Sequence, residues 1–437
     1  MTCRRPVRPG RARPAGTRAL SLSVLAAAGL GLAPLALAQD AAGRTPNPLL
    51  TFTLSQGLGA ERNANLDPGS DEVEARSNTD VALAFETRTP VSTLSLGTDA
   101  TLDLPLSGDG DRRVRGPQLR FDYDRTVPSA SLSLSGRASE TDVAFLRTLG
   151  DFVDDDGTID LPDDFADFRG EGTRRNLRLD GDLSLRDNAP LGVILSAGTE
   201  VTDYSDVTSS DLVDFQETTF GAALRFRLTE VAEVTAGLRG STYDEDGADP
   251  VTRYGFDLAG AIERRDGQVS AQLTLDETDD GTRAALSFGR AIERRTLQLS
   301  GSLGVTRDGT GDLELTGSLQ ATRELANGSA SVALDQSVET VEGNDEKVVT
   351  TVSANYARAL TPVASLSVDA LFGRSQDTGS DESTRTLEVG ATLSRQVTED
   401  WDLSLGLRAR QRDETGAETA RGQDLFLTLG RSFRGGF

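Results

Sequence analysis

The chain has 437 residues and a formal net charge of −24 at pH 7, from 45 basic and 69 acidic residues. It contains no histidine and one cysteine, Cys3, so Ser-His-Asp hydrolysis, acid–base catalysis by histidine, histidine zinc sites and an intramolecular disulfide are excluded. We therefore expect a protein that is not an enzyme, and its acidic charge argues against nucleic acid as a partner.

Residues 1–38 have the pattern of a cleaved signal peptide. Arginines precede an apolar stretch from Ala19 to Leu37, and a small-x-small cleavage pattern ends at Ala38. A transmembrane anchor is the alternative, but the stretch lacks a stop-transfer flank. Removing this segment takes away six arginines and no acid, so the formal net charge changes from −24 to −30. We predict export to the periplasm and a mature protein of residues 39–437.

The mature chain alternates apolar and polar residues. Leu119, Phe121 and Tyr123, for example, alternate with Arg120 and Asp122. An amphipathic helix would need apolar residues at i, i+3 and i+4, and no long window offers them. Nor does any later stretch approach the roughly 20 apolar residues of a spanning helix. The period of two predicts an all-β protein, a transmembrane antiparallel up-and-down β-barrel of about 20 strands.

Windows of this alternation place the strands in chain order. They fall near 49–58, 79–88, 92–104, 117–126, 130–140, 174–186, 191–203, 217–228, 233–243, 252–264, 268–277, 282–293, 296–307, 311–323, 328–339, 346–358, 363–374, 384–395, 400–411 and 424–433. A soluble β-sandwich or β-solenoid is the alternative, but the chain shows neither a domain linker nor a repeat of fixed period.

The links between these strands alternate in length. Those after even-numbered strands are tight, as at Thr361-Pro362, whereas those after odd-numbered strands are mostly longer and acidic, as at 59–78 and 141–173. Short turns on the periplasmic side and long loops outside are the arrangement of outer-membrane barrels. With an even number of strands, both termini are expected in the periplasm.

The longest link, 141–173, interleaves acids with phenylalanines. We predict that residues 150–168 fold inward and constrict the barrel, because a bore of this many strands would otherwise be wide. Its candidate constriction residues are Asp154, Asp155, Asp156, Asp163 and Asp164. Their expected partners are inward arginines, namely Arg120, Arg178, Arg225 and Arg227. A solvated surface loop is the alternative.

The polar face of the strands carries many charges. The candidate pore-lining residues are Arg120, Arg137, Arg178, Arg225, Arg227, Arg239, Asp122, Asp180, Asp182, Asp257 and Asp276. Charged side chains at membrane depth are tolerated only when they face water or pair with each other. Two interpretations follow: a pore lined with opposed charges, or a salt-bridged lumen that holds the wall together.

The positions of the tyrosines and the tryptophan indicate where the strands would meet the two membrane interfaces. Tyr204, Tyr243 and Tyr254 fall at expected exterior strand ends, and Tyr356 and Trp401 fall at expected periplasmic ends. These are the positions of the aromatic girdles of transmembrane barrels.

The last stretch resembles the final strand of bacterial outer-membrane proteins. Leu425, Leu427, Leu429 and Phe433 share the parity of the terminal Phe437. In that class a terminal aromatic is the signal read by the assembly machinery. The resemblance therefore implies that Phe437 is the assembly signal, and that the barrel assembly machinery and outer-membrane lipids are partners.

Within that class the chain resembles porins and porin-like channels, since residues 39–48 leave no room for a plug domain before the first strand. The resemblance implies an outer-membrane channel that passes small hydrophilic solutes by diffusion, and the acidic charge predicts a bias toward cations. The alternative is a non-conducting barrel for adhesion, surface structure or binding of an export partner. No cofactor is expected, although weak Ca²⁺ or Mg²⁺ binding by the acidic loops stays open. The transported solute and the oligomeric state are also left open.

Overall fold

The computed structural model describes residues 48–107, 112–154, 157–168, 170–209, 212–278, 281–341, 345–378 and 382–436. The strands are β1 (Leu49–Arg62), β2 (Val73–Arg88), β3 (Ser92–Ser107), β4 (Arg113–Val127), β5 (Ala130–Asp142), β6 (Thr173–Leu185), β7 (Leu191–Ser205), β8 (Phe215–Arg227), β9 (Ala232–Glu245), β10 (Val251–Arg264), β11 (Gly267–Thr278), β12 (Gly281–Arg294), β13 (Leu297–Arg307), β14 (Leu313–Leu325), β15 (Gly328–Val341), β16 (Asp345–Thr361), β17 (Ala364–Asp377), β18 (Ser383–Gln396), β19 (Trp401–Glu414) and β20 (Ala420–Gly436). Three short 3₁₀ helices follow β5: η1 (Val143–Arg147), η2 (Leu149–Phe152) and η3 (Asp163–Asp167).

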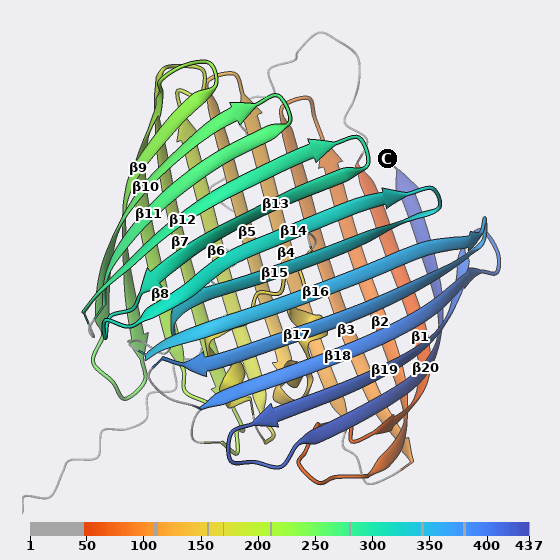
Figure 1. Cartoon of the computed structure of the whole chain (residues 1–437). Helices are drawn as coiled ribbons and strands as arrows, with labels where there is room; N and C mark the ends of the chain where they lie inside the picture. The colour runs from red at the N-terminus through yellow and green to blue at the C-terminus, as the bar shows by residue number, and fades with distance from the viewer. Residues whose placement is uncertain are drawn as a thin grey trace, which may run out of the picture. The chain divides into compact units, whose positions relative to one another are not determined.

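The strands close into one barrel. Each pairs antiparallel with the next in sequence, and β1 pairs with β20 from Leu49–Gly436 to Arg62–Gln423. Figure 1 shows the tilted strands winding around the lumen. Closure pairs every described strand on both sides, which satisfies its backbone groups without water. The predicted all-β, antiparallel barrel of twenty strands is confirmed.

The two faces of the wall differ in polarity, as the alternation predicted. Phe220, Leu238 and Leu303 are 64%, 66% and 70% exposed on the outer face. Alternate positions face the lumen, where Arg120 and Arg178 line a cavity. A transmembrane barrel carries an outward apolar band and a polar interior. Among the residues that the structure describes, no helix is long and apolar enough to span a membrane.

The strands extend beyond their predicted ends, which shortens several links. The predicted link 59–78 shrinks to residues 63–72, because β1 continues to Arg62 and β2 begins at Val73. The reason is that backbone pairing continues to Arg62 and Val73, past the windows of clear apolar alternation. The link between β5 and β6 remains long, at residues 143–172.

The expected aromatic girdle is wrong at two positions. Tyr204 donates a hydrogen bond to Asp164 in the lumen, and Tyr243 is buried against Phe215 with 5.5 Å between ring centroids. Each lies an odd number of residues from an outward leucine of its strand, so the pleat turns it inward. Tyr254, which is 63% exposed, keeps an outward place.

Candidate functional site: the lumen and its inward loop

The link between β5 and β6 lies inside the barrel rather than on its rim. Figure 1 shows its yellow 3₁₀ segments behind β16–β18. Its apolar side chains do not lie on the outer face of a strand, where lipid could cover them, and they pack against one another instead. The cluster contains Val143, Leu146, Leu149, Ile159, Leu161, Phe165 and Phe168, with Leu212, Val349 and Leu371. The lumen therefore contains a small hydrophobic core of its own.

Polar contacts fasten this segment to the half of the ring opposite β5 and β6. The Arg412 guanidinium of β19 donates to the carbonyls of Phe165 and Ala166, at 3.3 and 3.2 Å. On β18, Glu388 accepts a hydrogen bond from the backbone N–H of Leu149, and on β16 Ser353 donates to the carbonyl of Gly157. This part of the link, residues 143–168, thus crosses the lumen from wall to wall and is called the inward segment below.

A glycine in the opposite wall makes room for one of these contacts. A Cβ built on Gly373 of β17 would lie 2.9 Å from Cδ2 of Leu149 and 3.3 Å from Cδ1 of Leu161. Real Cβ atoms essentially never approach other heavy atoms below 3.0 Å. The absent side chain at this position therefore lets the apolar segment pack directly on the wall.

Asp164 anchors the segment on its own side of the lumen. Its carboxylate lies 3.0 Å from Nε of Arg174 on β6 and accepts the Tyr204 hydroxyl hydrogen bond. Asp164 and Arg174 are only 5% and 8% exposed. A buried carboxylate needs a cationic or hydrogen-bonding partner, because desolvation would otherwise destabilise it. Asp164 is therefore paired with Arg174, which is not among the four arginines expected as partners of the segment.

Arg147 ties this segment to the link between β1 and β2. Its guanidinium donates to the carbonyls of Asn65 and Gly170, at 2.5 and 2.6 Å, and reaches Oδ1 of Asp67 at 2.9 Å. The side chain is buried. One arginine therefore joins two links that are far apart in the sequence.

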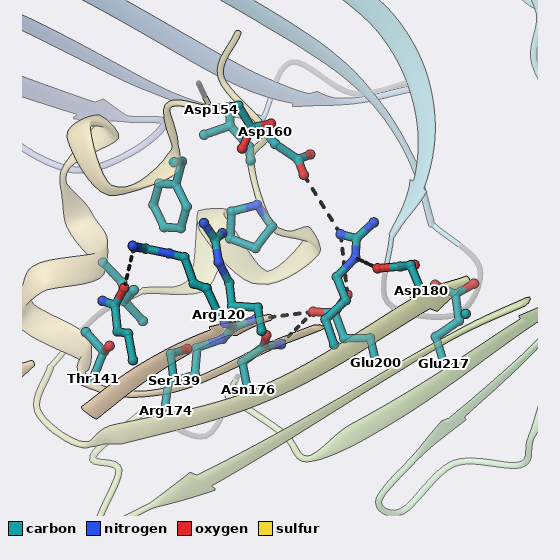
Figure 2. A pocket seen from close by; sticks show the side chains of 18 of the residues that line it. Arg120, Ser139, Thr141, Asp154, Asp160, Arg174, Asn176, Asp180, Glu200 and Glu217 are labelled. Atoms are coloured by element: carbon teal, nitrogen blue, oxygen red, sulfur yellow. Dashed lines mark hydrogen bonds and ion pairs between the residues drawn. The ribbon is translucent and has the colours of Figure 1, made fainter. Parts of the chain in front are cut away.

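A cavity of about 970 Å³ remains between this inward segment and the wall of β3–β8. Asp154 and Asp160 project from the segment, and Arg120, Arg174 and other wall residues face them (Figure 2). Seven carboxylates and five guanidinium groups line the space. The carboxylates belong to Asp99, Asp154, Asp160, Asp180, Glu200, Glu217 and Glu339, and the guanidiniums to Arg115, Arg120, Arg137, Arg174 and Arg178.

Several of these charges are paired across the cavity or along its wall. Arg178 lies 3.0 Å from Asp180 on its own strand and 3.9 Å from Asp160 of the inward segment. Arg120 lies 3.2 Å from Asp99. The cavity thus combines paired charges with a polar wall.

The solved structures similar to this chain have low sequence identity to it, between 8% and 12%. The siderophore receptor PirA from Pseudomonas aeruginosa has 10% identity and a TM-score of 0.45, with 90% of this chain and 81% of PirA covered. The ferric-catecholate import receptor Fiu from E. coli has 11% identity and a TM-score of 0.48, with 90% and 82% covered. OpdQ from Pseudomonas aeruginosa has 12% identity and a TM-score of 0.37, with 89% and 99% covered. Neither a protein-family model nor a curated protein matches the sequence.

The decisive observation is the closed wall itself, which is apolar outside and charged inside. The chain is a closed β-barrel with the apolar outer face and charged interior of a transmembrane barrel. A barrel of this kind crosses the bilayer with strands whose backbone groups are all paired.

The barrel brings four of the predicted pore-lining residues to this cavity, namely Arg120, Arg137, Arg178 and Asp180. Asp154 of the inward segment is exposed and lines the same cavity. Asp122 and Asp182 share the inward parity of their strands but do not line it. Asp155, Asp156 and Phe437, residues 1–38 and the side chain of Asp163 lie outside what the structure describes.

Two expected partners of the inward segment lie elsewhere. Arg225 is 2.8 Å from Asp187, and Arg227 donates to the Asp187 carbonyl at 3.0 Å. Both arginines stand at the end of β8 that joins the short turns, so they cannot meet the inward segment. Hydrogen bonds from Ser184, Arg225 and Ser131 hold the pKa of Asp187, in the link between β6 and β7, below its ordinary value.

The remaining predicted charges pair with each other along β9–β12. Arg239 lies 2.7 Å from Asp257 and 2.5 Å from Asp276. Asp276 also lies 3.1 Å from Arg283. In this part of the lumen the inward charges form a chain of ion pairs along the wall. Within the described residues, no group of three or more Asp, Glu, His or Cys side chains is arranged to hold a metal ion.

Sequence reasoning missed Arg174 and Glu339 as site residues. The alternation could have identified Arg174, because it lies four residues from Arg178 on the same strand and therefore faces the same side. Alternation also places Glu339 of β15 on the inward face, but alternation alone does not show that Glu339 lines this cavity.

Proposed function

We propose that this barrel is an outer-membrane channel through which small hydrophilic solutes diffuse, with a bias toward cations. The cavity of about 970 Å³ beside the inward segment carries the proposal, because it is polar and lies within the lumen. Its seven carboxylates outnumber its five guanidinium groups. A cleft lined by an excess of one sign raises the local concentration of ions of the opposite sign.

The inward segment sets the width of the passage in this proposal. It contacts β16, β18 and β19 on one side and β6 on the other, so it divides the lumen. Barrels of 16–18 strands already leave an aqueous channel, so an unobstructed barrel of this size would be wider. The segment therefore restricts diffusion to the space along β3–β8. The role assigned to the chain is transport and not catalysis.

Planar-bilayer recording tests the proposal. Replacing residues 150–168 with a short Gly-Ser linker is expected to raise single-channel conductance and to admit larger sugars. The matched control replaces residues 246–250, in the link between β9 and β10, with a linker of equal length, and its conductance should stay at the wild-type value. Unchanged conductance in the first variant, once it is shown to fold, contradicts the proposed constriction.

The cation bias has a separate readout. Under a KCl gradient the reversal potential should show preference for K⁺, and the preference should fade as salt rises, because the Debye length falls from about 10 Å at 0.1 M to about 3 Å at 1 M. Preference for Cl⁻ at low salt contradicts the bias.

A non-conducting barrel is the second candidate, and the hydrophobic core inside the lumen favours it. The apolar side chains of the segment are buried together, and Arg147 fastens the segment to a second link. In that case the wild-type protein gives no conductance steps, whereas the variant lacking residues 150–168 does.

Signal-directed export by residues 1–38 and recognition of Phe437 by the assembly machinery belong to the proposed function as well. Deleting Phe437 should reduce recovery of the heat-modifiable barrel in the outer membrane. Full recovery of the deletion variant argues against the terminal signal.

A further inference from the structure

Three arginines stand side by side on neighbouring strands of the cavity wall. The strand register pairs Arg120 of β4 with Arg137 of β5, and Arg137 with Arg178 of β6. All three line the same cavity. Like charges placed directly opposite each other on adjacent strands are destabilising. The row therefore needs compensating negative charge.

The outer two arginines have that compensation within the protein. Arg120 lies 3.2 Å from Asp99, and Arg178 lies 3.0 Å from Asp180. Arg178 is also 3.9 Å from Asp160 and from Glu200. Both side chains are thus held in place by carboxylates of this chain.

The central arginine differs from its neighbours. Arg137 forms no hydrogen bond or ion pair with any of the residues that the structure describes, and its side chain is exposed to the cavity. The inward neighbours on its own strand, Ser135 and Ser139, are small hydroxyl residues. They carry no charge that could neutralise a guanidinium and leave space beside it.

We propose that Arg137 is the centre of a binding position for an oxyanion group, a carboxylate or a phosphate, carried by a small solute in the lumen. The inference rests on the proposed channel function only in assigning the solute as a permeant. The planar guanidinium donates two parallel hydrogen bonds to either group. A bound oxyanion would also relieve the repulsion between Arg137 and its two neighbours.

The proposed oxyanion position is confined to the surroundings of Arg137, so it is compatible with a cation bias of the cavity as a whole. The carboxylates of Asp154 and Asp160 lie on the inward segment (Figure 2), and Asp160 meets the row only at Arg178, 3.9 Å away. An oxyanion is therefore favoured only where it can reach Arg137. Elsewhere in the cavity the excess of carboxylates favours cations.

The site can be tested by measuring weak binding of small anions to the folded barrel in detergent. This measurement does not require that the barrel conducts. Saturation-transfer difference NMR would use succinate for the carboxylate arm, glycerol 3-phosphate for the phosphate arm and glycerol as the neutral reference. Wild type should give a saturable signal with at least one anion and none with glycerol. The anion with the lower dissociation constant identifies the preferred oxyanion group.

Three variants make the assignment specific. Arg137→Gln should weaken binding by about tenfold, the order expected for loss of a charge-assisted hydrogen bond, whereas Arg137→Lys should retain part of it. Arg88→Gln is the matched control, because Arg88 is an arginine at the end of β2 whose side chain is 73% exposed. It removes the same charge and should leave binding unchanged.

The outcomes separate this site from the channel proposal. Binding that Arg137→Gln leaves at the wild-type level, or that Arg88→Gln lowers equally, overturns the site even if the barrel conducts. Loss of binding in Arg137→Gln alone, in a barrel that does not conduct, supports the site and overturns the channel. Unboiled and boiled samples of each variant on SDS gels establish that all three barrels fold.

Discussion

The wall and the inward segment use the same apolar residue types in opposite ways. On the wall, Leu303 is 70% exposed on the outer face, whereas Phe165 in the segment is 1% exposed. The wall side chains are covered by lipid in a membrane, and the segment side chains are covered by protein. The segment is therefore stabilised by its own packing and not by the bilayer, so the two regions should respond differently to the same kind of substitution.

The largest effect is expected from truncating the core of the segment. Phe165 packs edge-on against Phe152 and Phe168, with centroids 5.8 and 6.1 Å apart, and Arg412 lies over its ring. Phe165→Ala should lower the free energy of local opening of the segment by about 3–5 kcal/mol. Hydrogen exchange of residues 143–168 measures this opening.

The control for this variant is Phe220→Ala, which truncates a wall phenylalanine that is 64% exposed. Exchange in the segment should then stay at the wild-type rate. Equal acceleration of segment exchange in both variants would show that the segment has no separate stability.

A charge on the outer face should affect the wall instead. Leu303→Arg, near the middle of β13, should lower the free energy of unfolding in lipid vesicles by about 2–4 kcal/mol, because an arginine there faces hydrocarbon. Leu313→Arg, at the start of β14, should cost about 0–1 kcal/mol, because strand ends lie near the interface. Urea titration measures both, and equal losses would contradict the assigned depth.

The contact between the two regions has a smaller expected effect. Gly373→Ala places a methyl group 2.9 Å from Cδ2 of Leu149, and overpacking of this kind typically costs about 1–3 kcal/mol. Adding Leu149→Ala should remove the clash, so the double variant should be more stable than the sum of the two single losses predicts. Additive losses in urea titration would show that the two residues do not touch.

The smallest effect concerns a turn on the wall and depends on pH. The pKa of Asp187 is held below its ordinary value by hydrogen bonds from Ser184, Arg225 and Ser131. The unfolded chain then binds the proton more tightly than the folded barrel, so this stabilisation is present above the ordinary carboxyl pKa and is lost as pH falls through the folded pKa. Asp187→Asn should therefore be less stable than wild type at pH 7, and the two should converge in acid.

Urea titration at several pH values follows this convergence. The segment provides an internal reference, because its hydrogen exchange at pH 7 should be the same in both proteins. A stability difference that persists unchanged in acid would show that the Asp187 charge is not its cause.

The alternation of residues determined the wall of this barrel. Leu119, Phe121 and Arg120 could be assigned to faces from their parity alone, because a pleated strand sends successive side chains to opposite sides. The same local rule predicted the number of strands and their pairing with the next strand in sequence. At Tyr204 and Tyr243 the position along the strand predicts an interfacial side chain, but the parity of both residues turns them inward.

The interior required the tertiary structure. The pattern of residues 143–168 is compatible with both a surface loop and an inward segment, and only contacts with Ser353, Glu388 and Arg412 show which occurs. These three residues are separated from their partners in the segment by 196 to 247 positions in the sequence. Only the closure of the barrel brings them opposite the segment. The partners of individual charges were decided in the same way, because an ion pair depends on depth within the lumen as well as on the face of a strand. Arg225 and Arg178 both face the lumen but lie at different depths. Arg225 therefore pairs with Asp187, whereas Arg178 pairs with Asp180 and Asp160.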